Sequence, residues 1–323
     1  MLYPFTFKPI FKERVWGGRR LQELYGKELP PDVPIGESWE ITDRPEGVSE
    51  ITNGPLAGKN LRWLMEHHRD ELLGNARDYD GRFPLLIKIL DSSQKLSLQV
   101  HPPAHKAKEL SGEPKTEMWY VADATSDADI FVGLKKGVTR AQFAEKISAR
   151  TVADCFHRHG VQRGDVMFLP SGRVHALGAG SVIFEIQQNS DTTYRVFDWN
   201  RVGLDGKPRE LHVPQAMASI DFDDFEPELV ASDFSGDKPK VRSLVDAPLF
   251  TVENWQLSAG DTAQPRNGHC QAVAVLTGSI NVFDGGTTVS LSSGQFCILP
   301  ACLEQRSIQA VDDSGLLITT PGG

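Results

Sequence analysis

The sequence has 323 residues, of which 40% are hydrophobic and 24% are charged, and this composition is typical of a folded globular protein rather than a disordered or fibrous one. Its formal net charge of −9 argues against a nucleic-acid-binding protein, because phosphate backbones require a basic surface. No apolar run reaches the roughly 20 residues of a membrane-spanning helix, and the charged N-terminal segment lacks the apolar core of a signal peptide. We therefore expect a cytoplasmic protein with neither membrane nor nucleic-acid partners.

The first clear element along the chain is a helix. Residues 61–74 place apolar side chains at helical spacing, and the segment ends at Gly74. A second helical stretch is predicted from Thr139, which is suited to cap it, to Gly160, with a break near Thr151. The rest of the pattern favours strands.

Short β-rich segments separated by Gly, Pro, Ser and Asp begin at Phe83. They cover 83–90, 95–102, 117–124, 165–172, 181–188 and 192–199. An acidic, proline-containing connector follows at 223–241, and strand-like segments resume at 249–257, 270–283, 287–300 and 315–320. This spacing predicts antiparallel barrels or sandwiches.

Polar residues alternate with apolar ones in the segment 95–101. On a strand, Ser97, Gln99 and His101 share one face while the leucines and valine between them share the other. Glu117 opens another strand, and His175 follows a turn. Two histidines, a carboxylate and an amide oxygen suit zinc or a similar divalent ion, so we predict a metal site here. For 95–101 taken alone, a solvated strand with an incidental histidine is the alternative.

The turn before His175 has the pattern Gly164-x5-Pro170-x-Gly172-x2-His175. Glycine and proline at these positions favour a tight turn that directs the histidine back toward a barrel mouth. The pattern resembles the second conserved motif of the cupin superfamily. The first cupin motif usually supplies a His-x-His pair, and here Gln99-Val100-His101 stands in its place.

The Gln-x-His-Pro sequence resembles type I mannose-6-phosphate isomerases, and further segments agree with that family. These are VWGG at 15–18, GESWEIT at 36–42, LIKIL at 86–90, LSLQVHP at 96–102, PKTEMWYV at 114–121 and SDTTYRVFDW at 190–199. The resemblance extends from the N-terminus to about residue 215. The compact length is similar to the short bacterial form of the family.

The resemblance implies a fold and a set of functional residues. The fold is mainly β: a cupin-type antiparallel barrel, or jelly roll, with a second, degenerate C-terminal cupin-like barrel and a few helices. One Zn²⁺ per chain is implied, with the ligands Gln99, His101, Glu117 and His175. The other implied site residues are Trp16, Lys88, Ser97, Lys115, Glu185 and Arg195.

Several of these residues have a simpler interpretation that the sequence leaves open. Lys88, within an apolar run, is either buried with a partner or exposed on a strand. Lys115 is either beside the metal or solvated in a loop, and Glu185 points either inward or outward. Arg195 either binds a substrate anion through its planar fork of donors or forms a structural salt bridge with Asp198 or Asp191.

Four other histidines are discounted as ligands. His67 and His68 lie on the first predicted helix and are expected at the surface. His157 and His159 are two residues apart, a poor chelating geometry on a helix.

The four cysteines, Cys155, Cys270, Cys297 and Cys302, form no CxxC pair, and we expect them to be reduced and mostly buried.

Two domains are predicted, a catalytic cupin domain at 1–225 and a cupin-like domain without metal at 226–323. Gly294-x5-Pro300 repeats the Gly164-x5-Pro170 spacing, with chance as the rival explanation, but Cys302 and Gln305 follow where the pattern would have Gly and His.

The predicted activity is metal-dependent aldose–ketose isomerisation between D-mannose 6-phosphate and D-fructose 6-phosphate through a cis-enediol. Arg195 with Lys88 is predicted to take the substrate's negative charge, at the phosphate or at the enediolate, and Ser97 and Trp16 to line the sugar site. Glu185 or Lys115 is predicted to transfer the proton. The rivals are another metal-dependent cupin enzyme, such as an oxygenase, and a non-catalytic sugar-phosphate-binding cupin. A monomer or weak homodimer is expected.

Overall fold

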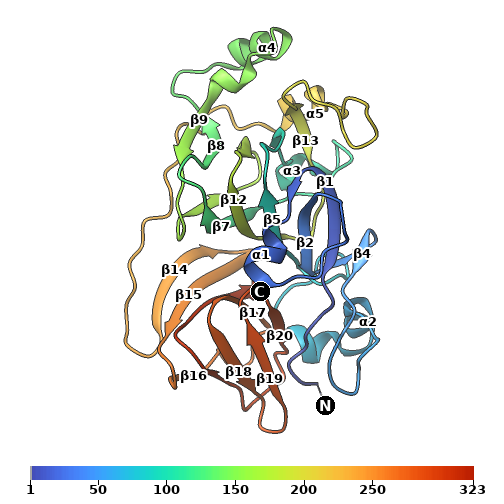
Figure 1. The fold of residues 1–323 in the computed structure, drawn as a ribbon. Coiled ribbons are helices and arrows are strands. Elements are labelled where there is room, and N and C mark those ends of the chain that lie inside the picture. The colour runs from blue at the N-terminus through green and yellow to red at the C-terminus, as the bar shows by residue number, and fades with distance from the viewer. Residues whose placement is uncertain (1) are drawn as a thin grey trace. The chain divides into compact units, whose positions relative to one another are not determined.

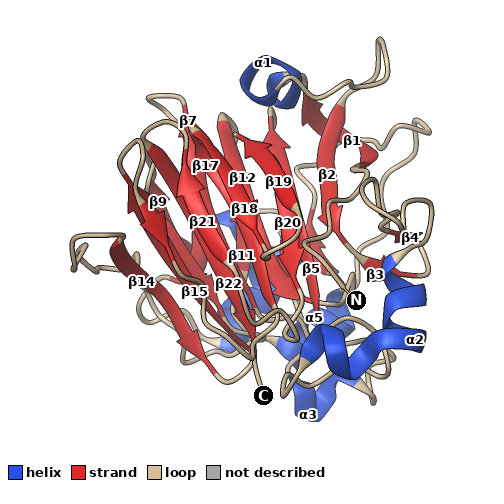
Figure 2. Cartoon of the chain, turned by 90° about the horizontal axis from the view of Figure 1, so that it is seen from below, coloured by secondary structure: helices blue, strands red, loops and turns tan. Residues whose placement is uncertain are grey.

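The computed structural model describes residues 2–323, and strands form most of its regular structure (Figures 1 and 2). The chain separates into two compact units, each built from segments that are not continuous in sequence. One unit contains residues 11–38 and 88–230, and the other contains residues 2–10, 39–87 and 231–323. We call them the first and the second unit. Three of their boundaries fall inside strands, namely β1 (Ile10–Gly18), β2 (Ile35–Ile41) and β5 (Leu85–Ser92), and the fourth falls before β14.

The first unit contains most of a six-stranded sheet and all of a five-stranded sheet. The six-stranded sheet has the order β1-β2-β5-β12-β7-β10, and its other strands are β1 (Ile10–Gly18), β12 (Ser181–Gln188), β7 (Glu117–Ala124) and β10 (Val166–Leu169). The five-stranded sheet has the order β13-β6-β11-β8-β9, formed by β13 (Tyr194–Phe197), β6 (Leu98–Val100), β11 (His175–Leu177), β8 (Asp129–Leu134) and β9 (Phe156–Gly160). The strand pairs recorded in both sheets are antiparallel.

Apolar side chains from both sheets form a shared core in the first unit. Trp119, Ile183 and Leu169 of the six-stranded sheet pack in one cluster with Ile130 and Leu177 of the five-stranded sheet. Side chains on successive strand residues point to opposite faces, so each strand contributes every second residue to this cluster. The mainly β, cupin-type fold predicted from the sequence is confirmed.

The second unit has a five-stranded sheet of order β14-β15-β22-β17-β20 and a four-stranded sheet of order β16-β21-β18-β19. Their strands are β14 (Lys240–Ala247), β15 (Phe250–Leu257), β22 (Ser314–Pro321), β17 (Gln271–Thr277), β20 (Phe296–Leu299), β16 (Thr262–Ala263), β21 (Ser307–Ala310), β18 (Ser279–Phe283) and β19 (Thr288–Ser292). One apolar cluster, including Val273, Leu316, Val282 and Ile308, draws on both sheets.

The two units repeat a pattern of strand pairing. In the first, β7 lies between β12 and β10, and in the second, β17 lies between β22 and β20. The repeat extends to the register, since Glu117 pairs with Leu169 and Gln271 pairs with Leu299. Leu169 and Leu299 each precede the proline of the Gly-x5-Pro spacing. This correspondence supports an internal repeat over chance.

The predicted helix at 61–74 is confirmed as α2 (Leu61–Leu73), which belongs to the second unit. The Asn60 side chain caps it by accepting a hydrogen bond from the Trp63 N–H at 2.8 Å. The helix ends at Gly74, whose positive φ of 61° is readily adopted by a residue without a Cβ. Two leucines near its end, Leu72 and Leu73, are fully buried.

The second helical prediction is partly wrong. Thr139 does cap a helix, α4 (Arg140–Ser148), through a capping box with Gln142. The chain then forms a 3-10 turn, η1 (Val152–Cys155), and continues as strand β9, so residues 156–160 are not helical. Pairing of β9 with β8 provides backbone partners that a lone helical turn would not have, and this overrides the local pattern.

The remaining elements are short. They are the helices α1 (Arg20–Tyr25), α3 (Ala104–Ala107) and α5 (Val213–Ser219), and the two-residue strands β3 (Asp43–Arg44) and β4 (Gly47–Val48). The predicted connector at 223–241 has almost no regular structure before β14. None of the helices among residues 2–323 is long and apolar enough to cross a membrane.

The contacts divide the chain differently from the predicted domains. Residues 39–87, which the sequence analysis assigns to the catalytic domain, belong to the second unit with the C-terminal strands.

All four cysteines are free thiols; Cys155, Cys270 and Cys297 are buried and Cys302 is exposed.

Candidate active site

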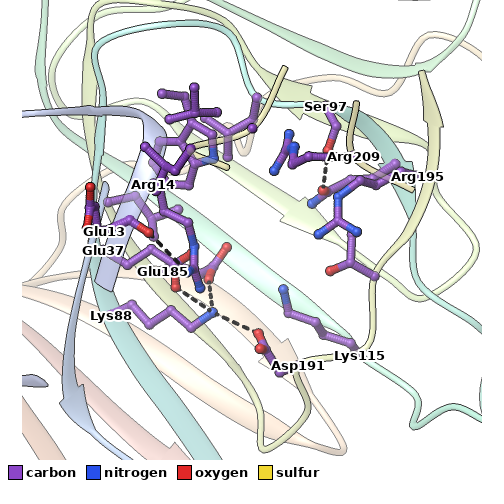
Figure 3. Close-up of a pocket in the computed structure, with 18 residues that line it drawn as sticks. Glu13, Arg14, Glu37, Lys88, Ser97, Lys115, Glu185, Asp191, Arg195 and Arg209 are labelled. Carbon is purple, nitrogen blue, oxygen red and sulfur yellow. Dashed lines mark hydrogen bonds and ion pairs between the residues drawn. The ribbon is translucent and has the colours of Figure 1, made fainter. Parts of the chain in front are cut away.

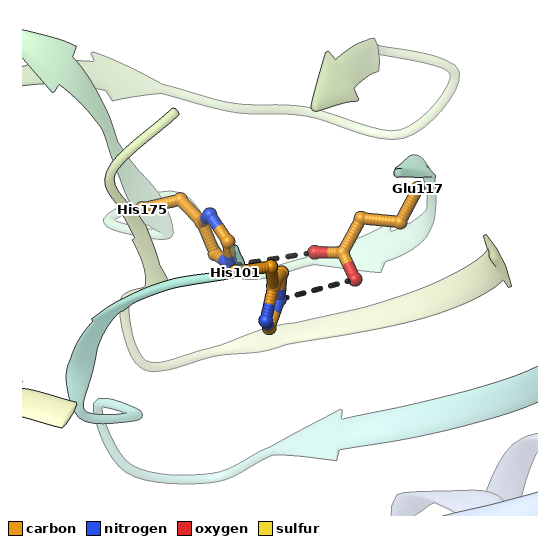
Figure 4. A group of neighbouring side chains, drawn as sticks. All are labelled: His101, Glu117 and His175. Carbon is orange, nitrogen blue, oxygen red and sulfur yellow. Dashed lines mark ion pairs between the residues drawn. The ribbon is translucent and has the colours of Figure 1, made fainter. Parts of the chain in front are cut away.

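Two histidines and a glutamate from three strands of the first unit come together in its interior (Figure 4). His101 follows β6, Glu117 opens β7 and His175 opens β11. Glu117 Oε1 lies 3.4 Å from His175 Nε2, and Glu117 Oε2 lies 3.6 Å from His101 Nε2. The three residues are at most 1% exposed. We call His101, Glu117 and His175 the metal-ligand cluster.

Gln99 lies directly beside this cluster. It is the register partner of His175 across β6 and β11, and its amide nitrogen is 3.3 Å from His175 Nε2. A half-turn of the amide exchanges its oxygen and nitrogen, which have nearly the same shape, and brings the oxygen toward the same point. The hydroxyl of Ser97 lies 3.3 Å from the other amide atom of Gln99, which confirms that these two residues share a strand face.

The turn that the sequence predicts before His175 also holds His101. Gly172 has a φ of 97°, a left-handed conformation that favours glycine, and its N–H donates to the His101 carbonyl at 2.9 Å. The end of β6 and the turn leading into β11 are thereby tied together. The two histidines approach with ring centroids 4.7 Å apart as a consequence.

Backbone carbonyls orient both imidazole rings. His101 Nδ1 donates to the carbonyl of Thr192 at 2.7 Å, and His175 Nδ1 donates to the carbonyl of Arg173 at 2.9 Å. Each Nε2 then carries a lone pair directed at the centre of the cluster. Burial lowers the pKa of both rings, with a contribution from Lys115, and that of His101 falls to about 4. The rings are therefore neutral and suited to ligate a metal.

Glu117 is the negatively charged member of the metal-ligand cluster. Burial acts to raise its pKa, but the Lys115 ammonium at 2.8 Å and the neighbouring histidines outweigh burial and hold the pKa well below its usual range. Within residues 2–323, Glu117 Oε1 and His101 Nε2 are buried without a hydrogen-bond partner, while Glu117 Oε2 lies 2.8 Å from the Lys115 ammonium. Buried polar atoms are rarely left without a partner, and a divalent ion at the centre would satisfy Glu117 Oε1 and His101 Nε2.

A cavity of about 360 Å³ lies next to the cluster, and both Gln99 and Lys115 line it. Figure 3 shows Lys115 with other charged residues of this cavity. Its walls come from β1, β2, β5, β12, β13 and the loop after β13. The structure brings every predicted site residue outside the metal-ligand cluster to this cavity. Those residues are Trp16, Lys88, Ser97, Gln99, Lys115, Glu185 and Arg195.

Lys88 is buried in the cavity wall, at 3% exposure, so its interpretation as an exposed strand lysine is wrong. Its ammonium lies 3.3 Å from Glu185, 3.7 Å from Glu37 and 3.7 Å from Asp191 (Figure 3). Burial acts to lower the pKa of Lys88, but the three carboxylates outweigh burial and raise it. Lys88 is a fully charged centre around which three acidic side chains are arranged.

Glu185 points inward and not to solvent. It is 4% exposed and accepts a hydrogen bond from Trp119 Nε1 at 3.0 Å. The same indole ring meets the edge of His175, with ring centroids 5.4 Å apart. Trp119 therefore links the position of Glu185 to that of the metal-ligand cluster.

Arg195 does not form the structural salt bridge that was its alternative interpretation. Within residues 2–323, no carboxylate lies within 4.0 Å of its guanidinium, and its buried Nε makes no hydrogen bond. Asp198 instead binds Arg201 and Arg209. Burial, followed by the nearby Arg209, lowers the pKa of Arg195.

Five charged cavity residues were not among the predicted site residues: Glu13, Arg14, Glu37, Asp191 and Arg209. Glu37 and Asp191 lie inside segments that carried the family resemblance, so a signal was available for both. Arg14 is on β1, where Glu37 holds its Nε at 2.7 Å. Arg209 lies in an irregular loop with no periodic pattern, and nothing in the sequence distinguished it.

The discounted histidines lie outside the cluster, but one argument against them was wrong. His157 and His159 are on strand β9 and not on a helix, and their rings are close, with centroids 4.4 Å apart. His159 is engaged with the Pro227 carbonyl at 2.7 Å. His67 and His68 lie on α2, where both pack on Trp63.

Comparisons with known proteins agree with this geometry. Residues 5–127 match the family described as phosphomannose isomerase type I, catalytic domain. The chain is 35% identical to the probable mannose-6-phosphate isomerase GmuF of Bacillus subtilis over 312 residues, which cover 96% of this chain and 97% of that protein. The chain belongs to the type I phosphomannose isomerase family.

Solved structures give the same result for the fold. The crystal structure of the mannose 6-phosphate isomerase from Bacillus subtilis matches with a TM-score of 0.90 and 31% identity, covering 98% of this chain and 99% of that one. A zinc-bound mannose 6-phosphate isomerase matches with a TM-score of 0.78 over the whole of both chains, and at 17% identity it supports the fold alone. Type I phosphomannose isomerases interconvert mannose 6-phosphate and fructose 6-phosphate.

Proposed function

We propose that this chain carries out its family's reaction, the interconversion of D-mannose 6-phosphate and D-fructose 6-phosphate, in the cavity beside the metal-ligand cluster. The observation that carries the proposal is that the cavity and the metal-ligand cluster adjoin each other. Gln99 and Lys115 each line the cavity, and each contacts a member of the cluster. A substrate in the cavity would therefore meet the metal directly.

One Zn²⁺ would be held by Gln99, His101, Glu117 and His175. Two neutral imidazoles, one carboxylate and one amide oxygen match the ligand preferences of zinc, and one negative ligand leaves the ion with net positive charge. When bound, zinc polarises the substrate's oxygens and stabilises negative charge that develops on them.

The isomerisation moves a hydrogen between C2 and C1 through a cis-enediol, so a side chain must remove a proton and return it to the neighbouring carbon. Lys115 and Glu185 are the two candidates, and both are buried in the cavity wall. Lys115 is held by Glu117 at 2.8 Å, and Glu185 is held by Trp119 and Lys88. Each candidate is fixed in position, as a proton-transferring group must be.

The two predicted cations have different roles in this proposal. Lys88 is matched by three carboxylates, and its role is to orient Glu185 and Asp191. Arg195 has no carboxylate partner, and it would take the substrate's phosphate with its free guanidinium edge. Ser97 and Trp16 would line the sugar site, where the indole offers an apolar face to the carbon chain.

The proposal is tested by a coupled assay for fructose 6-phosphate before and after chelation, together with zinc analysis. We expect one zinc per chain, loss of activity on chelation and recovery on adding zinc back. Gln99→Ala should lower the zinc content, whereas Arg195→Ala should keep zinc and raise KM for mannose 6-phosphate. Iron with oxygen consumption, or a zinc-loaded protein that forms no fructose 6-phosphate, would contradict the proposal.

The assignment of the proton-transferring group needs a separate measurement. Glu185→Gln and Lys115→Met are compared for exchange of the substrate's C2 hydrogen with solvent deuterium, at matched zinc content. The variant that loses exchange while still binding substrate identifies the group. If both variants exchange at the wild-type rate, neither side chain has this role.

We infer a cytoplasmic enzyme that is a monomer or a weak homodimer. All proposed site residues fall within residues 1–225, and residues 226–323 are proposed to form a domain without a metal.

A further inference from the structure

Two arginines of the cavity, Arg195 and Arg209, lie apart from its cluster of carboxylates. Three carboxylates surround Lys88 on one side, while Arg195 and Arg209 lie together on the other (Figure 3). Arg209 is the charged group that most disfavours the charged form of Arg195. Two cations held this close raise the free energy of the ligand-free site, and an anion between them would relieve the repulsion.

Asp198 holds Arg209 in place. The guanidinium Nε donates to Asp198 Oδ2 and the Nη2 donates to Asp198 Oδ1, both at 2.6 Å, in a two-pronged contact. Asp198 is 5% exposed. The remaining Nη1 of Arg209 makes no hydrogen bond within residues 2–323, and the residue lines the cavity. One face of Arg209 is fixed, and the other is available to a ligand.

Asp198 does not neutralise this arrangement, because it also binds Arg201. Arg201 donates from Nε at 3.0 Å and from Nη2 at 2.8 Å to Asp198 Oδ1. Its Nη1 donates to the carbonyl of Lys95, so all three of its nitrogens are engaged. Arg201 and Arg209 share one carboxylate, so their combined charge is positive. Of these two arginines, only Arg209 lines the cavity.

The strand register places this cationic end at a distance from the metal-ligand cluster. His175 pairs with Gln99, and Gln99 pairs with Arg195, so the three residues form a row across β11, β6 and β13. Neighbouring strands are about 4.8 Å apart, which puts Arg195 roughly 10 Å from His175 at the backbone. A sugar phosphate with its reacting carbons at the cluster would extend its terminal phosphate along this row.

We propose that Arg209, positioned by Asp198, binds the phosphate of the substrate together with Arg195. The inference rests on the proposed function and adds a binding residue and its positioning partner to it. The two arginines come from different segments, one on β13 and one in the loop that follows it. The guanidinium groups of both residues lie at the same end of the cavity (Figure 3).

The chain offers a matched control for the test, because Arg201 binds the same carboxylate from the same loop but does not line the cavity. Arg209→Ala should raise KM for mannose 6-phosphate, and the inhibition constant of inorganic phosphate, by about tenfold to a hundredfold, the range expected for losing a charge-assisted hydrogen bond. Arg201→Ala should change both constants by no more than about twofold to threefold, because Arg201 does not line the cavity in which the phosphate would bind. Zinc content should stay at the wild-type value in both variants.

Arg209→Lys provides a second variant that retains the charge, and it should recover part of the phosphate affinity. Equal effects of the two alanine variants, or an unchanged inhibition constant for phosphate in Arg209→Ala, would overturn the inference. Its failure is distinct from failure of the proposed function, because the latter would appear as absent zinc or absent isomerase activity in the wild-type protein of the same experiment.

Discussion

Replacing Lys88 with methionine tests whether the carboxylates around it depend on its charge. Lys88 Nζ lies 3.3 Å from Glu185, and at an effective dielectric constant near 20 that pair alone is worth about 5 kcal/mol before the cost of burial is subtracted. Removing one partner of a buried ion pair typically destabilises a protein by about 3–5 kcal/mol, because the other charge remains. We therefore expect Lys88→Met to lower the melting temperature of the transition that unfolds the first unit by roughly 6–20 °C at pH 8.

The loss of stability in Lys88→Met should depend on pH in a defined direction. Because the pKa of Lys88 is raised in the folded protein, its stabilising contribution is complete at neutral pH and is lost only under strongly alkaline conditions. In Lys88→Met the buried carboxyls lose their cation, and burial then favours their protonated form. The deficit in stability should therefore be larger at pH 8 than at pH 5.

The measurement is thermal unfolding followed by tryptophan fluorescence and calorimetry at both pH values. Lys146→Met is the control, since Lys146 forms a surface pair with Asp154 at 3.2 Å and should contribute less than about 1 kcal/mol. The reasoning is refuted if Lys88→Met is no more destabilising than the control, or if its deficit is larger at pH 5.

Three further perturbations address the metal, a helix and the loop after β13. Glu117→Gln removes the only negative ligand, so zinc content per chain and isomerase activity should fall together; retention of a full zinc complement would contradict the assignment. Thr139→Ala breaks the capping box with Gln142 and should cost about 1 kcal/mol of unfolding free energy, with no change in KM. Arg201 and Arg209 outweigh burial and hold the pKa of Asp198 below its usual 3.8, so Asp198→Asn should cost about 3 kcal/mol at pH 7. That difference should shrink as the pH falls below 3.8, and a constant difference in acid unfolding curves would show that the charge is not responsible.

The residues that could be predicted from the sequence are those whose position depends on a local period or turn. Strand alternation put Gln99 and His101 on one face, and the conformation required of Gly172 oriented the turn before His175. The apolar run around Lys88 left burial with a partner and exposure on a strand both open, and the structure shows burial. These predictions depend on short-range geometry, which every strand or turn of the same pattern shares.

The residues that were missed depend on topology. Arg209 reaches the cavity because the loop after β13 returns to Asp198, and the sequence carries no period that records such a return. The error at His157 has the same origin, since the partner that makes β9 a strand is β8, more than twenty positions earlier in the chain. Long-range pairing also explains why residues 39–87 belong with the C-terminal strands.

The two units show that the strand framework and the metal site have separate requirements. Glu117 and Gln271 occupy corresponding positions, each paired with the leucine that precedes the proline of a Gly-x5-Pro turn. A buried carboxylate at this position needs a cation, and Lys115 provides it at 2.8 Å. A buried amide needs only a hydrogen bond, and Gln271 donates one to Thr320 at 3.1 Å. The same backbone position therefore accepts either a charged or a neutral side chain.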